Sequence, residues 1–291
     1  MKILLTNNHL RQLGGSETFT YTIAKELKRL GHDVDVFTYV EGLVSEKIKQ
    51  LGVPIRLRDS YDLILANHRT CVEDVHHKGF TIQTCHSKRS SLEKPNPKAH
   101  KFISISQEIR ETLKLIGIQS DIILNSIDCE RFSIQRPLRR KIKRVLSLSF
   151  SEKLNNELKE IFESKKIQFF ARSKYNRPVW DIERYINTVD LVISLGRGCY
   201  ESLACGRPVL VLDERKYQGR LGDGLIVPEN IDEAVKYNCS GRRYKREDAR
   251  QMVEEALRQY DYHLQDYYRM YAENNLDVKK QIQKYLAIKN D

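Results

Sequence analysis

Apolar and polar residues follow two different periods along the first half of the chain. Short apolar runs, typical of buried strands, are separated by stretches with apolar residues three or four positions apart, typical of helices. The clearest helical stretch has Phe19, Ile23, Leu27 and Leu30 on one side and Gly31 at its end. The strand-like runs are KILLTNN (2–8), HDVDVFTYV (32–40), VPIRLR (53–58), YDLILANH (61–68), FTIQTCH (80–86), KFISIS (101–106) and SDIILN (120–125). Strands alternating with helices predict a parallel sheet covered on both faces.

The composition changes at SIQRPLRRKIKR (133–144), where a proline and a run of basic residues predict a linker. A second strand–helix series then begins with VLSLSF and ends in helices from about residue 246. We therefore expect an N-terminal Rossmann-like domain, a C-terminal Rossmann-like domain and a last helix that packs back on the first domain. The expected bounds are 1–135, 144–272 and 273–291.

The charge balance narrows the class of partner. The 291 residues include 50 Lys+Arg and 39 Asp+Glu, a formal net charge of +11. This excess favours an anionic partner: a phosphorylated small molecule, an anionic membrane surface or nucleic acid. A lysine-rich surface without any partner is the alternative. The six cysteines fit neither a C-x-x-C motif nor a dense disulfide framework, and no apolar run approaches the ~18 residues of a membrane span. We expect a reduced, cytoplasmic protein without a transmembrane segment.

The first candidate site is the loop LGGSE (13–17) between the first strand and the first helix. Gly14 and Gly15 would let a ligand approach the backbone, and the helix N-terminus offers N–H groups to a phosphate. The loop lacks the G-x-G-x-x-G pattern of dinucleotide-binding folds, so a purely structural loop is the alternative.

The second candidate site lies in VDLVISLGRGCYESLACGRPVLVLD (189–213), where a Gly196-Arg197-Gly198 turn joins an apolar run to a helix. Ligands of such folds bind beyond the carboxyl ends of the strands. Arg197 could pair with a phosphate, and Glu201 could accept hydrogen bonds from ribose hydroxyls. The alternative makes Glu201 a solvated helix acid.

Two histidines end strand-like runs in the first half. His86 follows FTIQTC and His68 follows LILAN, and both would lie at the carboxyl edge of the sheet. Histidine suits hydrogen bonding or proton exchange near neutral pH, and the sequence alone does not choose between the two. The D-x-D of Asp33 and Asp35 lies inside an alternating strand, so we expect neither a metal site there nor any required metal elsewhere.

Six segments, in the same order, resemble the family 4 retaining glycosyltransferases, which have the GT-B fold of two facing Rossmann-like domains. LGGSE is similar to the family's G-G-x-E loop, and LKRLGHDVDVFT is similar to its L-x-x-x-G-H-x-V-x-V. The other four are TIQTCHS, NSIDCERF, YESLACGRPVLV and GDGLIVPEN. They resemble the strand-then-histidine segment, N-G-V-D-x-x-x-F, E-A-x-A-x-G-x-P-V and G-x-x-G-L-L-V-P.

The resemblance implies transfer of a hexosyl group from a nucleotide-diphosphate sugar, without a metal or another cofactor. The C-terminal domain would bind the donor, with Glu201 on the ribose, Gly14 and Gly15 on the diphosphate, and His86 on the sugar or acceptor. Gly196, Arg197, Gly198 and Arg172 would complete the donor site. The acceptor would dock on the N-terminal domain near His68, Lys88 and Arg89.

Two departures from the family pattern concern the donor. Ile193 stands where the family has a glutamate eight residues before Glu201, and the usual Arg and Lys at the start of the second domain are not apparent in LSLSFSEKLNN. Breaking a sugar–diphosphate bond builds negative charge on the departing phosphate, which N–H groups and cations stabilise. We therefore expect a replacement cation among Lys153, Arg172 and Arg197, and we expect His86, Arg197 and Lys153 to act in catalysis.

Three functions fit these features. The first is a glycosyltransferase with a saccharide or lipid-linked acceptor, which would work in the cytoplasm or at a membrane surface. The second is a transferase acting on a hydroxymethylated base of viral DNA in the infected host cell, favoured by the charge and by SKRSS, RPLRRKIKR and GRRYKR. The third, favoured by Ile193, is a nucleotide-sugar-binding protein with reduced catalysis.

Overall fold

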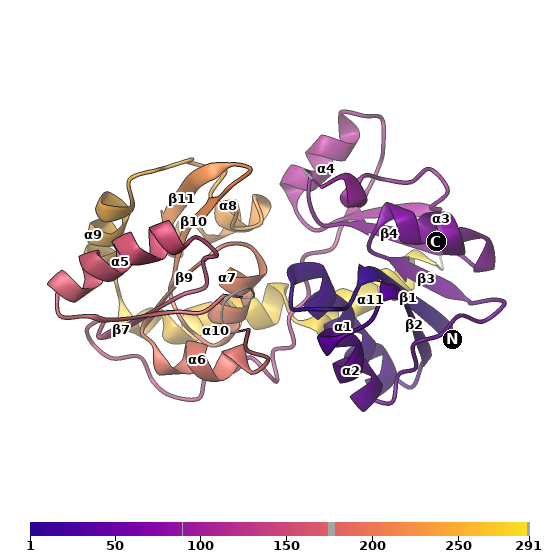
Figure 1. Cartoon of the computed structure of the whole chain (residues 1–291), viewed down its shortest axis with the longest axis horizontal. Coiled ribbons are helices and arrows are strands. Elements are labelled where there is room, and N and C mark those ends of the chain that lie inside the picture. The colour runs from indigo at the N-terminus through magenta and orange to yellow at the C-terminus, as the bar shows by residue number, and fades with distance from the viewer. Residues whose placement is uncertain (89, 174–177, 290–291) are drawn as a thin grey trace. The chain divides into compact units, whose positions relative to one another are not determined.

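The computed structural model describes residues 1–88, 90–173 and 178–289. The chain forms two compact units (Figure 1). Unit 1 comprises Met1–Ser126 and Asp277–Asp291, and unit 2 comprises Ile127–Leu276. The basic stretch 133–144 lies within unit 2, where Leu138 and Ile142 are buried.

Unit 1 is built on a parallel sheet with strand order β2-β1-β3-β4-β5-β6. Its strands are β1 (Lys2–His9), β2 (Asp33–Val40), β3 (Leu63–Ala66), β4 (Thr81–Cys85), β5 (Lys101–Ser104) and β6 (Asp121–Ile122). Its helices are α1 (Gly15–Arg29), α2 (Leu43–Gln50), α3 (Arg69–Val75), α4 (Gln107–Lys114) and α11 (Val278–Ile288), with short 3-10 turns at His76–Lys78 and Ser91–Glu93. The inner strands β3 and β4 are buried along their whole length because both faces of the sheet are covered.

The predicted strand at 53–58 is wrong, because this segment makes a single parallel bridge between Ile55 and Val36. Its alternating pattern has another cause. Arg56 Nε lies 2.9 Å from Asp35 Oδ1, and Arg58 Nε lies 2.5 Å from Asp35 Oδ2. The two arginines therefore compensate the buried Asp35, and this acid of the D-x-D sequence is engaged in ion pairs.

Unit 2 has the strand order β11-β10-β9-β7-β8. Its strands are β7 (Arg144–Ser147), β8 (Gln168–Ala171), β9 (Leu191–Ser194), β10 (Val209–Arg215) and β11 (Gly219–Leu225). Its helices are α5 (Glu152–Ser164), α6 (Ile182–Thr188), α7 (Arg197–Ala204), α8 (Ile231–Lys236), α9 (Ala249–Gln259) and α10 (Gln265–Asn275), with a 3-10 turn at Tyr262–Leu264. All neighbouring strands are parallel except β10 and β11. These two are antiparallel because the connection at 216–218 is too short for a crossover.

Each sheet has a topological switch point, where the chain moves to one side of a strand and then returns to its other side. In unit 1 this point lies between β1 and β3, and in unit 2 it lies between β7 and β9. In open α/β sheets, ligands bind beyond the carboxyl ends of the strands at such a point. The segments that follow β1, β3, β7 and β9 are therefore the first places to look for a site.

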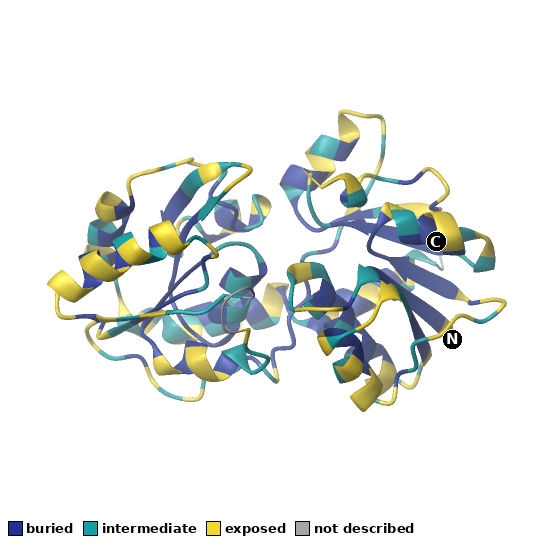
Figure 2. Cartoon of the chain, in the orientation of Figure 1, coloured by how far each residue is buried: buried dark blue, intermediate teal, exposed yellow. Residues whose placement is uncertain are grey.

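Buried residues follow the strands of both units, and exposed residues gather on the outer sides of the helices (Figure 2). The last helix, α11, packs against α1 and so returns to unit 1, as the resemblance implied. Within the described part of the chain, no helix is both long enough and apolar enough to span a membrane.

Candidate functional site

The switch point of unit 2 carries a sharp turn at Gly196. Its φ of 58° and ψ of −128° form a backbone conformation that is almost confined to glycine. The Gly196 N–H donates to the Cys239 carbonyl at 2.9 Å, and α7 starts at the next residue. The turn therefore directs the N-terminus of α7 toward the carboxyl edge of the sheet.

Arg197 and Glu201 form an ion pair one turn apart on α7. Arg197 Nε lies 2.8 Å from Glu201 Oε1, and the two side chains are only 7% and 12% exposed. Burial lowers the pKa of Arg197, and the Glu201 carboxylate opposes that shift. Burial also raises the pKa of Glu201, opposed by the charges of Arg197 and Arg131. The two predicted donor ligands are thus brought together, each compensating the charge of the other.

A second ion pair, which the sequence did not suggest, lies beside the first. Arg131 donates from Nη2 to Glu183 Oε2 at 3.0 Å and to the Trp180 carbonyl, and its guanidinium lies 4.9 Å from the Trp180 ring centroid. The charges of Arg131 and Glu183 both act on Glu201. The segment NSIDCERF, which carries Arg131, was the only signal that could have pointed to this pair.

The other predicted donor residues have different surroundings. A Cβ on Gly198 would lie 2.3 Å from Ser194 Oγ, so this glycine permits close packing of α7 on β9. The Arg172 guanidinium lies 5.1 Å from the Tyr185 ring centroid. The Lys153 side chain is 79% exposed, and its Nζ lies 3.7 Å from Glu214 Oε1.

In unit 1, the glycine loop before α1 is occupied by a carboxylate. A Cβ on Gly14 would lie 2.2 Å from Glu17 Oε2, because the Glu17 side chain folds back over this glycine. His9 Nδ1 lies 3.2 Å from Glu17 Oε1, and the Ser16 hydroxyl donates to Oε2 at 3.0 Å. Gly15 is exposed, and a Cβ there would meet no atom within 4 Å. A ligand phosphate would therefore meet less obstruction at Gly15 than at Gly14.

His68 lies at the switch point of unit 1, with both ring nitrogens near partners. The Asn8 backbone N–H donates to Nδ1 at 3.0 Å, and Nε2 lies 3.4 Å from Glu93 Oε1. Because a backbone N–H can only donate, Nδ1 is the acceptor and the proton sits on Nε2. The side chain is also only 6% exposed. Both ring nitrogens of His68 are therefore engaged by groups of the protein itself.

His86 follows β4 and is more accessible than His68. Its Nε2 lies 2.9 Å from Asn67 Oδ1, while the Asn67 amide nitrogen donates to the Thr6 carbonyl and to Thr20 Oγ1, both at 2.9 Å. The Thr6 carbonyl can only accept, so Oδ1 of Asn67 must face the histidine and Nε2 carries the proton. Glu93 accepts the His86 backbone N–H at 2.8 Å. Asn67 and Glu93 thus orient the ring.

The two basic residues predicted for the acceptor lie just after His86. The Lys88 ammonium lies 2.7 Å from Glu108 Oε1, so its charge is compensated. Arg89 lies outside the described residues. No group of three or more His, Cys, Asp or Glu side chains suited to a metal ion occurs within residues 1–88, 90–173 and 178–289.

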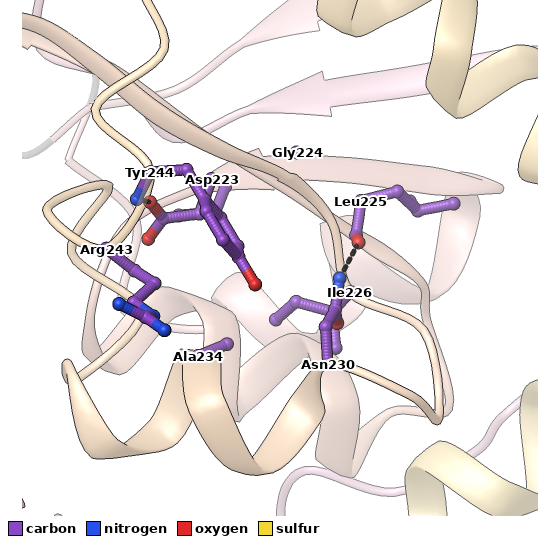
Figure 3. A pocket seen from close by; sticks show the side chains of 9 residues that line it. Asp223, Gly224, Leu225, Ile226, Asn230, Ala234, Arg243 and Tyr244 are labelled. Carbon is purple, nitrogen blue, oxygen red and sulfur yellow. Dashed lines mark hydrogen bonds between the residues drawn. The ribbon is translucent and has the colours of Figure 1, made fainter.

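A small pocket in unit 2 lies between β10, β11, α8 and the loop 241–246. Asp223 and Tyr244 line one side and Asn230 the other (Figure 3). The cavity volume is about 10 Å³, which is room for about one water molecule. Asp223 Oδ1 accepts the Tyr244 N–H at 2.8 Å, whereas Oδ2 is buried and has no hydrogen-bond partner among the residues that the structure describes. The pocket is too small for a nucleotide.

We expect the melting temperature of Asp223→Asn, relative to that of the wild type, to increase as the pH rises from about 4. Burial raises the pKa of Asp223, against several backbone N–H groups of the 241–245 segment that lower it. Above the ordinary carboxyl pKa of about 3.9, the unfolded chain loses this proton before the folded protein does. Wild-type stability then falls with rising pH until the folded pKa is passed. Calorimetry between pH 4 and 8 measures the difference in melting temperature.

The exposed Asp266 provides the control for that experiment. Asp266→Asn removes a carboxylate from the surface, so its free energy of unfolding should stay within about 0.5 kcal/mol of that of the wild type. A melting-temperature difference for Asp223→Asn that shrinks as pH rises would contradict the assignment of Asp223 as a carboxylate disfavoured by burial.

Comparison with known proteins identifies the fold. No protein-family model and no curated protein sequence matches the chain. A glycosyltransferase from Rickettsia africae is similar in structure, with TM-score 0.64 and 16% identity over 99% of this chain and 97% of that one. Anabaena Alr3699/HepE in complex with UDP and glucose has TM-score 0.64 and 14% identity over 99% of both chains. An alpha-glucosyltransferase in complex with UDP and a 13-mer DNA containing an HMU base has TM-score 0.58 and 10% identity over 100% of both.

These identities are too low to carry over an activity, but the agreement extends over nearly the whole chain. Three features of the chain are those of a GT-B fold: the order of its elements, its two Rossmann-like sheets and the return of the last helix to unit 1. The chain therefore has the GT-B fold.

Proposed function

We propose that this protein is a glycosyltransferase that moves a hexosyl group from a nucleotide-diphosphate sugar to an acceptor hydroxyl, with retention of configuration. One observation carries the proposal: the Gly196 turn places the buried Arg197–Glu201 pair of α7 at the switch point of a GT-B sheet. A ligand there would meet backbone N–H groups, a cation and a carboxylate together. The similar structures that contain UDP with glucose or DNA support the same class of donor.

The ion pair does not prevent Glu201 from binding the donor ribose. Arg197 Nε bonds to Oε1 of Glu201, and a carboxylate can accept further hydrogen bonds at its second oxygen. Ribose hydroxyls are donors of the required kind, and Arg197 would hold the carboxylate in place for them. Ile193 lies in the core of β9 with no exposed surface, so the contacts to sugar hydroxyls come from other residues.

The chemistry requires stabilisation of the leaving diphosphate. The bond between the anomeric carbon and the diphosphate oxygen breaks, and its electron pair stays on that oxygen. The acceptor oxygen forms the new bond, and its proton leaves with the diphosphate. The backbone N–H groups at the start of α7 would stabilise the developing negative charge without a metal ion.

Gly15→Ala tests whether the donor phosphates approach the N-terminus of α1, where Gly15 is the first residue. Because a Cβ at Gly15 meets no atom within 4 Å, we expect stability to change by less than about 0.5 kcal/mol. Donor affinity should fall about tenfold if a phosphate approaches this backbone, because the methyl group would hold it away from an N–H group. Thermal melting and calorimetric titration measure the two effects. Unchanged affinity would remove Gly15 from the donor site.

The direct test of function is a panel of nucleotide sugars combined with saccharide, lipid-linked and DNA acceptors. Release of nucleoside diphosphate and an acceptor mass increased by one hexose unit would support the proposal. Binding of a donor without turnover on any acceptor would favour the protein with reduced catalysis. Absence of binding across the whole panel would overturn the proposal.

DNA carrying a hydroxymethylated base is the second candidate acceptor. The net charge of +11 favours it, as does the similar structure bound to DNA with an HMU base. Contacts to several phosphates make DNA binding fall steeply with salt concentration. Transfer to modified DNA that declines strongly between about 50 and 200 mM salt would select this acceptor, and salt-insensitive transfer to a saccharide would exclude it.

A further inference from the structure

The carboxyl edge of unit 2 contains an arginine that the sequence did not indicate as part of a site. Arg215 ends β10, and its Nε donates to Asp213 Oδ2 at 2.8 Å. Asp213 is 2% exposed, and its other oxygen accepts the Ser149 hydroxyl and the Glu214 N–H. The aspartate therefore links Arg215, at the end of β10, to the segment that follows β7.

The position of this anchor follows from the strand order. Ser149 lies just beyond β7 and Asp213 lies on β10, while β9 runs between these two strands. The Ser149–Asp213 hydrogen bond therefore joins the neighbours of β9 at the edge where β9 ends, near the turn at Gly196. Arg215 is thus held beside the switch point at which the donor is proposed to bind.

Two aromatic residues fix the direction of the Arg215 side chain. Its guanidinium lies 5.3 Å from the Phe150 ring centroid, and Nη1 donates to the Tyr217 hydroxyl at 2.8 Å. Asp213 and Tyr217 raise the pKa of Arg215 although burial lowers it, so the group stays cationic. Within the described part of the chain, Nη2 of Arg215 makes no hydrogen bond. The guanidinium is oriented and still has N–H groups to donate.

The cations expected from the sequence are less suited to bind a phosphate at this edge. Arg197 is 7% exposed and paired with Glu201, Lys153 is 79% exposed, and Arg172 stacks on Tyr185 beyond the edge strand β8. An exposed lysine loses much side-chain entropy when it is ordered by a ligand. Arg215 has already lost that freedom, because Asp213, Phe150 and Tyr217 hold it.

We propose that Arg215 binds the diphosphate of the donor and stabilises the charge that develops on it as the sugar leaves. This proposal rests on the proposed function. Asp213 and Ser149 are positioning residues, because they act through the guanidinium. A planar guanidinium can donate two parallel hydrogen bonds to phosphate oxygens, which an ammonium group cannot do.

The test begins with titration of the wild-type protein with UDP, GDP, ADP and dTDP. The nucleoside diphosphate that binds most tightly is then compared with its own nucleoside on Arg215→Met. We expect affinity for the diphosphate to fall about tenfold, while affinity for the nucleoside, measured by ligand-detected NMR, stays unchanged. The kcat of transfer should fall roughly 100-fold, since the contact strengthens in the transition state. Arg215→Lys should recover part of the affinity and less of the kcat.

Lys216→Met is the control, because it removes the same charge from the neighbouring exposed position. It should match the wild type in binding and in kcat. If Arg215→Met does not fold, as judged by thermal melting, Arg215→Lys is measured in its place. A diphosphate affinity and a kcat equal to those of the wild type would then overturn the proposal. If the wild type binds a diphosphate and Arg215→Met has the same diphosphate affinity and the same kcat, the role of Arg215 is overturned, whereas the proposed function is not. Failure of the wild type to bind any of the four diphosphates overturns the proposed function as well.

Discussion

Replacing Glu201 by leucine should lower the stability of the protein by roughly 3 kcal/mol and its melting temperature by about 6–12 °C. The reason is that Arg197 would remain as a buried cation without its compensating carboxylate. Breaking a buried ion pair by removing one partner costs far more than replacing both partners. Differential scanning calorimetry measures this effect, and donor binding should be lost in the same variant.

The double variant Arg197→Met/Glu201→Leu separates stability from function. Its melting temperature should recover most of the loss, because the buried charges are removed together and replaced by apolar groups of similar size. Donor binding should remain absent, because both polar ligands have been removed. Recovery of donor binding together with stability would show that the pair is only structural, and unimpaired stability of Glu201→Leu would contradict the burial of Arg197.

Replacing His86 by glutamine should reduce sugar transfer about 100-fold and change donor affinity much less. A glutamine amide can replace the donation of Nε2 to Asn67 Oδ1, so the local fold should be kept while the other ring nitrogen is lost. Initial rates at saturating donor and calorimetric donor titration measure the two quantities.

His68→Asn is the matched control for His86. An asparagine oxygen can take the place of Nδ1 as acceptor of the Asn8 N–H, so this variant keeps the structural role of His68. Its transfer rate should stay close to that of the wild type. Normal turnover in His86→Gln together with loss of turnover in His68→Asn would reverse the roles of the two histidines.

The alternating periods of the sequence predicted most strands and helices correctly, because burial on a strand or a helix is written in local spacing. The segment 53–58 shows the limit. Its alternation arises from Arg56 and Arg58, which reach Asp35 from a neighbouring part of the chain. The antiparallel direction of β11 was not predicted from the sequence either, although the short connection at 216–218 imposes it.

The sequence by itself determined the two Rossmann-like halves, the glycine turn before α7 and the presence of Arg197 and Glu201 there. Only the tertiary structure decided which charges meet. It pairs Arg131 with Glu183 across 52 positions, anchors Arg215 through Asp213 and Ser149, and gives His68 and His86 different partners. The reason is that local spacing follows from the geometry of one helix or strand, whereas contacts at a sheet edge depend on the order of the strands, which residue periodicity does not encode.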